Sequence, residues 1–172
     1  MAAIEIKENE MPVVITNCVS DSVSSIFKKI FGVVPEYDGD DNSKNIGDGV
    51  VGIISFVGDA SWILMLAFPK DSAETLAEKF CGFEVPYDNP DMGDVIGELA
   101  NVMAGDIVAR MGVQGVKVAM SLPTVLRGQN VEPFMAKGIP DKKMHYTVLG
   151  KDVMIKIAVG NSNEMMGATP GA

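Results

Sequence analysis

The sequence predicts an α+β domain in which long helices pack on a largely antiparallel sheet. Residues 13–31 and 90–111 carry apolar residues at helical spacing, and two pairs of short apolar runs are each separated by a turn, as in β-hairpins. The order helix, short strand, hairpin occurs twice, over residues 13–68 and 90–159, which indicates a weak internal duplication. Elements of this kind can bury their apolar faces in one shared core.

The first helix is predicted over residues 13–31, with Gly32 at its end. Its apolar residues recur at steps of three and four and form one stripe, which comprises Ile15, Val19, Val23, Ile26, Phe27 and Ile30. A second helix is expected over residues 71–81, because Asp71 and Glu74 have the spacing of a capping box.

The third helix is predicted over residues 90–111. Asn89 is a favourable N-cap residue, and Pro90 suits the first helical position. Gly112 is expected to end this helix, as Gly32 ends the first.

The predicted strands are short and rich in apolar and β-branched residues. They lie at residues 50–57, 61–68, 116–121, 144–149 and 153–159. The acidic, turn-rich residues 38–49 are predicted to form an exposed loop. Residues 161–172 are expected to be a flexible C-terminal tail, so that residues 1–160 form a single domain.

Composition excludes several classes of protein. The 172 residues include 14 Lys and Arg against 23 Asp and Glu, so the formal charge of 14 − 23 = −9 excludes a basic nucleic-acid binder. No segment approaches about 20 consecutive apolar residues, and the N-terminus lacks the pattern of a signal peptide. We therefore expect a cytoplasmic protein without membrane insertion. Cys18 and Cys81 indicate neither a zinc site nor a disulfide scaffold.

The third predicted helix carries the clearest indication of function. A rotation of 100° per residue separates an apolar side from a polar side. The polar side carries Asp94, Glu98, Asn101 and Gly105. Glu98 and Asn101 lie on adjacent turns, close enough to act on one small group. Gly97 and Gly105 flank them. Because a glycine inside a helix lowers stability by about 1 kcal/mol relative to alanine, these two glycines indicate that a binding partner comes close to this stretch of backbone. A solvated polar face and close helix packing at the glycines are the alternative interpretations.

Two segments resemble a known family. Residues 97–105 read G-E-L-A-N-V-M-A-G, and residues 121–128 read S-L-P-T-V-L-R-G. The pair resembles the CheX family, relatives of the CheC phosphatases of bacterial chemotaxis, in which a G-E-L-x-N-x-x-x-G helix precedes an S-x-P-T-V-x-x-G segment. The resemblance also covers residues 52–82, spans most of residues 13–159, and implies the CheC-like fold.

The resemblance implies a phosphatase that hydrolyses the aspartyl phosphate of a phosphorylated CheY-like response-regulator receiver domain. In this reading Asn101 positions the attacking water and Glu98 engages the receiver's active-site lysine. An acyl phosphate is already reactive, so a water held in line by an amide suffices without a covalent nucleophile. We expect Asp94, Gly97 and Gly105 to contact the partner. The predicted face carries no cation, so Mg²⁺ and the lysine are expected to come from the receiver, and the chain itself is expected to hold no cofactor or metal.

The resemblance also implies a homodimer formed through the sheet. Aligning the two predicted helix ends, an offset of 112 − 32 = 80 residues, places Glu98 on Cys18 and Asn101 on Asp21. The first helix therefore lacks an E-x-x-N pair, whereas CheC-like proteins commonly carry two, and this favours CheX. The alternative function is a non-catalytic receiver-binding or flagellar-motor-associated adaptor on the same fold.

Other motifs carry less weight. Residues 38–42 begin like a calcium-binding loop, but Ser43 and Gly49 stand where a glycine and a bidentate glutamate are required, so a solvated connector is favoured. His145 has no nucleophile motif nearby and is interpreted as structural. Arg127 is interpreted as an ordinary surface charge.

Overall fold

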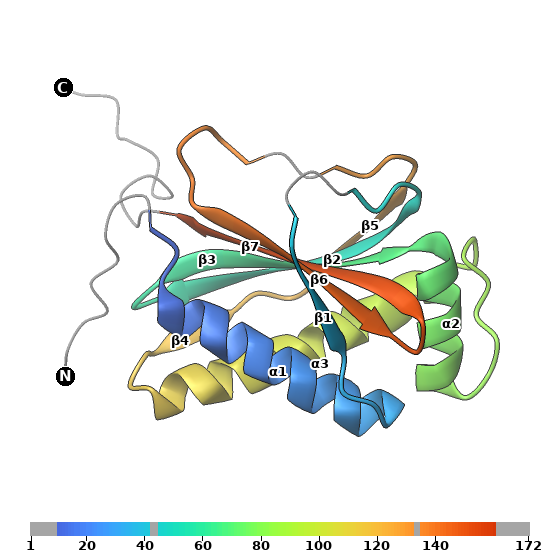
Figure 1. Cartoon of the computed structure of the whole chain (residues 1–172), viewed down its shortest axis with the longest axis horizontal. Coiled ribbons are helices and arrows are strands. Elements are labelled where there is room, and N and C mark those ends of the chain that lie inside the picture. Colours follow the sequence, from blue (N-terminus) through green and yellow to red (C-terminus); the bar gives the residue numbers. More distant parts are fainter. Residues whose placement is uncertain (1–9, 42–44, 133–134, 161–172) are drawn as a thin grey trace.

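The predicted fold class is confirmed by the structure, a computed structural model that describes residues 10–41, 45–132 and 135–160. Helices lie against one face of a seven-stranded sheet (Figure 1). The helices are α1 (Val13–Phe31), α2 (Lys70–Cys81) and α3 (Asp91–Val113). The strands are β1 (Glu36–Asp40), β2 (Gly49–Gly58), β3 (Ser61–Pro69), β4 (Val118–Met120), β5 (Thr124–Gly128), β6 (Asp141–Val148) and β7 (Lys151–Gly160). The strand pairs are antiparallel.

The strand order is β1-β6-β7-β3-β2, with β4 and β5 both paired to the outer side of β2. This order is symmetric about the central β3–β7 pair. β1 from the first half of the chain pairs with β6 from the second half, and β4 and β5 from the second half pair with β2 from the first. The symmetry agrees with the predicted internal duplication.

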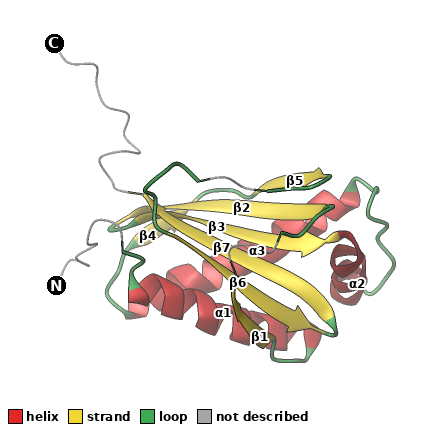
Figure 2. Cartoon of the chain, turned by 45° about the horizontal axis from the view of Figure 1, so that its top comes forward, coloured by secondary structure: helices red, strands yellow, loops and turns green. Residues whose placement is uncertain are grey.

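The main core lies between the helices and the sheet. Trp62 of β3 is fully buried there and stacks on Phe56 of β2, with ring centroids 3.9 Å apart. Figure 2 shows the helices on this side of the sheet, while loops cross the other side. Under these loops the opposite face of the sheet buries a second, smaller apolar cluster around Val51, Met65 and Met154.

The first two helices match the predictions with one exception. α1 has the predicted bounds, and Gly32 ends it at a φ of 77°, a conformation that glycine adopts without strain. The capping box predicted for α2 was wrong, because no side chain caps that helix. Asp71 instead pairs with Lys151 at 3.0 Å, and Glu74 accepts a hydrogen bond from the backbone N–H of Tyr87 at 2.9 Å. Both carboxylates therefore interact with residues outside α2 instead of capping it.

α3 begins at Asp91, one residue after the predicted Pro90, and the side-chain oxygen of Asn89 accepts a hydrogen bond from the N–H of Asp91 at 2.9 Å. Its predicted end at Gly112 was wrong. The helix continues to Val113, and Gly115, at a φ of 80°, is the first residue that leaves it in a left-handed conformation. The glycine exits of α1 and α3 are therefore 115 − 32 = 83 residues apart. At this offset Glu98 and Asn101 fall on Ile15 and Cys18, both buried in the core, so α1 again offers no second E-x-x-N pair.

Two edge strands lie outside the predicted strand ranges. β1 occupies residues 36–40, where a loop had been expected to begin at Asp38, and β5 lies just beyond Pro123. Most side chains of both strands are exposed, so neither shows the alternation of apolar and polar residues that indicates a strand. The hairpin of β6 and β7 was predicted, although β6 begins three residues earlier, at Asp141.

The motifs given less weight have structural partners. Asp38 accepts a hydrogen bond from Thr147, and Asp40 pairs with Lys142 at 3.0 Å, while Asn42 and Ser43 lie outside the described residues. His145 lies on β6 with a ring nitrogen 3.0 Å from the carbonyl oxygen of Asp41.

Within the described ranges no helix combines the length and the apolar character needed to cross a membrane. The tail predicted at residues 161–172 lies outside the described residues.

The position of α3 is fixed by a very close contact with β2. A Cβ atom at Gly52 would lie 3.0 Å from the Cβ of Ala100 and 3.4 Å from the Cγ2 of Ile96, both on α3. A side chain at residue 52 would push Ala100 and Ile96 away by a few tenths of an ångström, so α3 lies closer to the strand at this glycine than a larger residue would allow.

We predict that Gly52→Val lowers the free energy of unfolding by about 1–3 kcal/mol, because the added atoms overpack the contact with α3. Denaturant unfolding measures the change. Gly112→Ala in the last turn of α3 is the control, since no atom lies within 4 Å of its added Cβ. It should stabilise the protein by up to about 1 kcal/mol. Equal stability of Gly52→Val and the wild type would contradict the close contact.

Candidate functional site

The polar face of α3 follows from its contact with the sheet. Ile96 and Ala100 face β2 and are buried, so the residues two positions away project from the opposite side of the helix. Asp94 and Glu98 are exposed there, and Asn101 is half-buried. As predicted from the sequence, neither Glu98 nor Asn101 is enclosed in the core.

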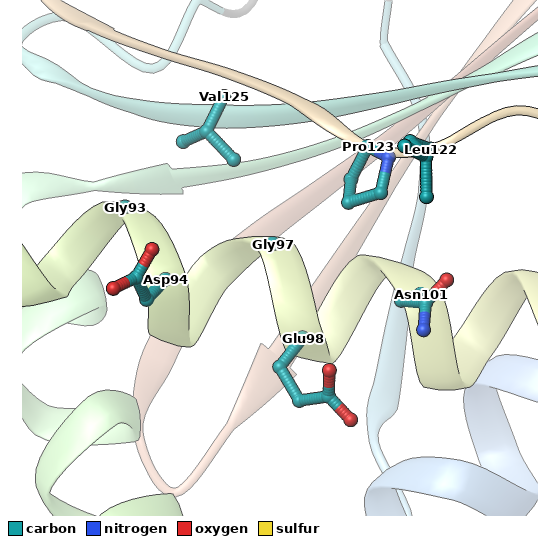
Figure 3. A pocket seen from close by; sticks show the side chains of 8 residues that line it. All are labelled: Gly93, Asp94, Gly97, Glu98, Asn101, Leu122, Pro123 and Val125. Atoms are coloured by element: carbon teal, nitrogen blue, oxygen red, sulfur yellow. The ribbon is translucent and has the colours of Figure 1, made fainter.

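These side chains open onto a groove of about 590 Å³ between α3 and the segment that leads from β4 into β5 (Figure 3). Side chains from both elements line it. The lining residues are Gly93, Asp94, Gly97, Glu98, Asn101, Leu122, Pro123 and Val125.

One wall of the groove is polar. Glu98 and Asn101 project from adjacent turns of α3, and Asp94 lies one turn before Glu98 (Figure 3). None of the three side chains has a hydrogen bond or ion pair with another residue in the described part of the chain. The described residues that line the groove include no Lys, Arg or His. Two carboxylates and an amide are thus available to a molecule that enters the groove, and the carboxylates favour a cationic group there.

The other wall is apolar and consists of Leu122, Pro123 and Val125. A Cβ atom at Gly97 would lie 3.5 Å from Val125 and 3.7 Å from Pro123, which are ordinary contact distances. An alanine would therefore fit at residue 97, but it would fill part of the groove floor. Gly93, one turn earlier, has no atom within 4 Å of an added Cβ. The two glycines keep this stretch of the floor bare.

The groove gathers most of the residues that the sequence indicated. Glu98, Asn101, Asp94 and Gly97 line it, but Gly105 does not. Gly105 is exposed with nothing within 4 Å, so close helix packing does not account for it either.

Sequence reasoning missed four residues of the lining. These are Gly93, Leu122, Pro123 and Val125. Gly93 precedes Gly97 by four residues, a spacing that places both on one helix face and could have revealed it. For Leu122, Pro123 and Val125, the S-L-P-T-V segment was noted, but the sequence carries no pattern that packs it against α3.

Arg127 is a structural anchor rather than an ordinary surface charge, which corrects the prediction. Its guanidinium donates hydrogen bonds to the carbonyl oxygens of Tyr87 at 2.7 Å and Asn89 at 3.0 Å. The Tyr87 hydroxyl in turn donates to the carbonyl oxygen of Gly49 at 2.8 Å. Burial raises the pKa of Tyr87, so its hydroxyl keeps the proton that it donates. These contacts tie β5 and β2 to the residues that start α3, and so fix one wall of the groove relative to the other.

The side chains of the groove limit the chemistry that this chain can supply by itself. Within the described ranges, no three His, Cys, Asp or Glu side chains are grouped so that they could hold a metal ion. The wall of α3 offers an amide that can both donate and accept hydrogen bonds, and carboxylates that can accept them. Such a surface can orient a water molecule and receive a cation.

Comparison with solved structures shows a shared fold. A CheC-like superfamily protein from Shewanella sp. PV-4 matches with a TM-score of 0.78 and 20% sequence identity, over 88% of this chain and 100% of that chain. The chemotaxis protein CheX from Vibrio vulnificus matches with a TM-score of 0.76 and 17% identity, over 85% and 99% of the two chains. A CheX–CheY–BeF₃–Mg²⁺ complex from Borrelia burgdorferi contains a chain that matches with a TM-score of 0.72 and 19% identity, over 85% and 97%. No curated protein matches the sequence.

The family follows from the sequence itself. The family model of the chemotaxis phosphatase CheX matches residues 50–138, which is more than half of the chain and includes all but the first residue of β2, the whole of α3 and both walls of the groove. The chain therefore belongs to the CheX family of chemotaxis phosphatases.

Proposed function

We propose that this chain is a cytoplasmic phosphatase that hydrolyses the aspartyl phosphate of a CheY-like receiver domain at the groove on α3. The observation that carries the proposal is the pair of Glu98 and Asn101 on adjacent turns, open to the groove and without internal partners in the described part of the chain. The phosphorus atom that is attacked and the aspartyl carboxylate that leaves both belong to the partner, so catalysis depends on what these two side chains do at its surface.

Asn101 is the residue that we assign to the attacking water. Its amide can accept a hydrogen bond from the water and donate another to a phosphate oxygen, which places the water in line with the bond that breaks. Asn101 is half-buried, so its side chain has fewer orientations to lose than a fully exposed one. The water oxygen bonds to phosphorus, the receiver's aspartate leaves as a carboxylate, and inorganic phosphate is released.

Glu98 is the residue that we assign to the receiver's active-site lysine. It is exposed beside Asn101, and the lining of the groove brings no cation that would compete for its carboxylate. A lysine on the partner would donate a charge-assisted hydrogen bond to this carboxylate. Asp94 adds a second negative charge on the same wall, which favours approach of a cationic surface.

We propose that Mg²⁺ accompanies the receiver rather than this chain. The solved Borrelia complex, which contains CheX, CheY, BeF₃ and Mg²⁺ together, supports this arrangement. In the reaction the ion would neutralise charge on the phosphate oxygens. The carboxylates of the polar wall would attract the cations of the partner.

We predict that Asn101→Ala lowers kcat for dephosphorylation of the receiver by on the order of 100-fold, the scale of losing one group that positions the reactants. The receiver domains of the same organism are phosphorylated with labelled phosphate and incubated one by one with the protein. The rate of phosphate release measures turnover, and the receiver that responds is the substrate.

Asn17→Ala, an exposed asparagine on α1, is the matched control and should keep the wild-type rate. Turnover by Asn101→Ala at the wild-type rate would reject the proposed role. Tight binding of a receiver by the wild type without faster dephosphorylation would favour the adaptor function.

We predict that Glu98→Gln, which keeps the shape of the side chain and removes its charge, raises KM by about 10-fold because the ion pair to the receiver's lysine is lost. The KM of the wild type should rise with salt concentration, and that of the variant should rise less. Glu78→Gln, at an exposed position on α2, is the control. An identical salt dependence in wild type and Glu98→Gln would contradict the ion pair.

We also propose that the protein is a homodimer. β1 is not expected to pair with its copy, because its Glu36, Asp38 and Asp40 would bring like charges together, and its bulge between Tyr37 and Gly39 interrupts pairing.

Light scattering is predicted to give twice the 18.3 kDa mass of one chain. The mass of a single chain at micromolar concentration would reject the dimer.

A further inference from the structure

We propose that Leu122 is an apolar anchor that inserts against the receiver beside its phosphorylated aspartate and so sets the affinity for this partner. The inference rests on the proposed function, because it assigns the apolar wall of the same groove to the same protein partner.

Leu122 lies in an irregular segment between two strands. β4 and β5 both pair with β2, with Met120 opposite Phe56 and Thr124 opposite Ile53. Between these two pairs, β2 has two residues and the facing segment has three. The extra residue makes a bulge, a feature that redirects a side chain out of the regular pattern of the sheet.

The bulge is held in place by Ser121. Its backbone N–H donates to the carbonyl oxygen of Ser55 at 2.8 Å, and its side-chain oxygen accepts a hydrogen bond from the N–H of Ser55 at 3.0 Å. The Ser121 hydroxyl also donates to the carbonyl oxygen of Leu122 at 2.9 Å. On the other side Pro123 has a fixed φ and packs towards Gly97 of α3. Leu122 is thus held on both sides, so little backbone freedom is lost when it binds.

The side chain of Leu122 is 86% exposed, although it lines the groove together with Asn101. One exposed leucine needs no explanation by itself. This one stands at the rim of the groove, continuous with the half-buried Pro123 and Val125, and faces the polar wall on which Glu98 and Asn101 lie (Figure 3). A protein surface that carries a cation beside an apolar patch complements both walls, whereas a small phosphorylated molecule would leave Leu122 in water.

The occupant that fits is therefore the receiver, with its cationic groups against α3 and an apolar side chain against Leu122. Apolar side chains that are fully enclosed near the centre of an interface carry a large share of the binding energy. Leu122 is beside the reacting groups, so it would be central in such an interface.

The test compares single variants of the full-length chain with the receiver identified by the phosphate-release assay. We expect Leu122→Ala to raise KM by about 10-fold and leave kcat within about twofold, because binding is weakened while Asn101 still orients the water. Leu122→Asp should raise KM further. The Kd for the same receiver carrying beryllofluoride in place of phosphate should rise by the same factor as KM.

Two control variants separate this role from general effects. Val113→Ala, at a position that is also 86% exposed but lies at the far end of α3, should leave KM unchanged. Leu126→Ala, an exposed leucine on β5 outside the groove lining, should also leave it unchanged.

An unchanged KM and Kd in Leu122→Ala would overturn the inference, as would a fall in kcat at constant KM. Either result would leave the phosphatase function standing if Asn101→Ala is inactive. Wild-type turnover in Asn101→Ala would instead reject the proposed function.

Discussion

The close approach of α3 to β2 at Gly52 is the constraint on which the rest of the site depends. Because residue 52 has no side chain, Ile96 and Ala100 lie almost on the strand, and this contact sets both the height and the rotation of the helix. Rotation decides which residues meet solvent, so the same contact that buries one face of α3 presents Glu98 and Asn101 on the other. Arg127 adds a second restraint by binding the carbonyl groups at the start of the helix. Packing and hydrogen bonding thereby align two walls that come from distant parts of the chain.

The two walls of the groove differ in their chemistry. Its carboxylates and amide have no cation among the described lining residues, while its second wall is apolar. A binding site that completes its own charge balance can act on a free small molecule, whereas this one complements a surface that brings positive charge with it. Under the proposed function, the division also separates two tasks. α3 carries the groups suited to chemistry, and the β4–β5 segment carries groups suited to recognition, so the two properties can change by substitution on different elements.

Much of the fold was predictable because its signals are local. The bounds of α1 follow from a regular apolar stripe and from Gly32, and the start of α3 follows from Asn89. The pair of Glu98 and Asn101 could be placed on an exposed face from helical periodicity alone. The features that were missed depend on tertiary partners.

The missed features show this dependence in particular residues. β1 and β5 are strands because β6 and β2 offer them free edges, not because of their own patterns. Glu74 accepts a hydrogen bond from Tyr87 instead of capping its helix. α3 passes Gly112 and ends at Val113, and beyond it the N–H of Val116 donates to the carbonyl oxygen of Met111 at 2.9 Å. Leu122 could not be assigned to the groove, because its place depends on a bulge that only strand pairing creates.

The symmetric strand order has a consequence for how the molecule must assemble. Each half of the chain completes its part of the sheet with an edge strand supplied by the other half, so the two halves are interleaved rather than adjacent. Neither half has all the neighbours of its own strands until the other is in place, which makes the domain a single cooperative unit dominated by contacts between distant residues. A chain cut in the connection between α2 and α3 would yield two fragments, each with an unfinished sheet, that reach the native arrangement only by mutual complementation.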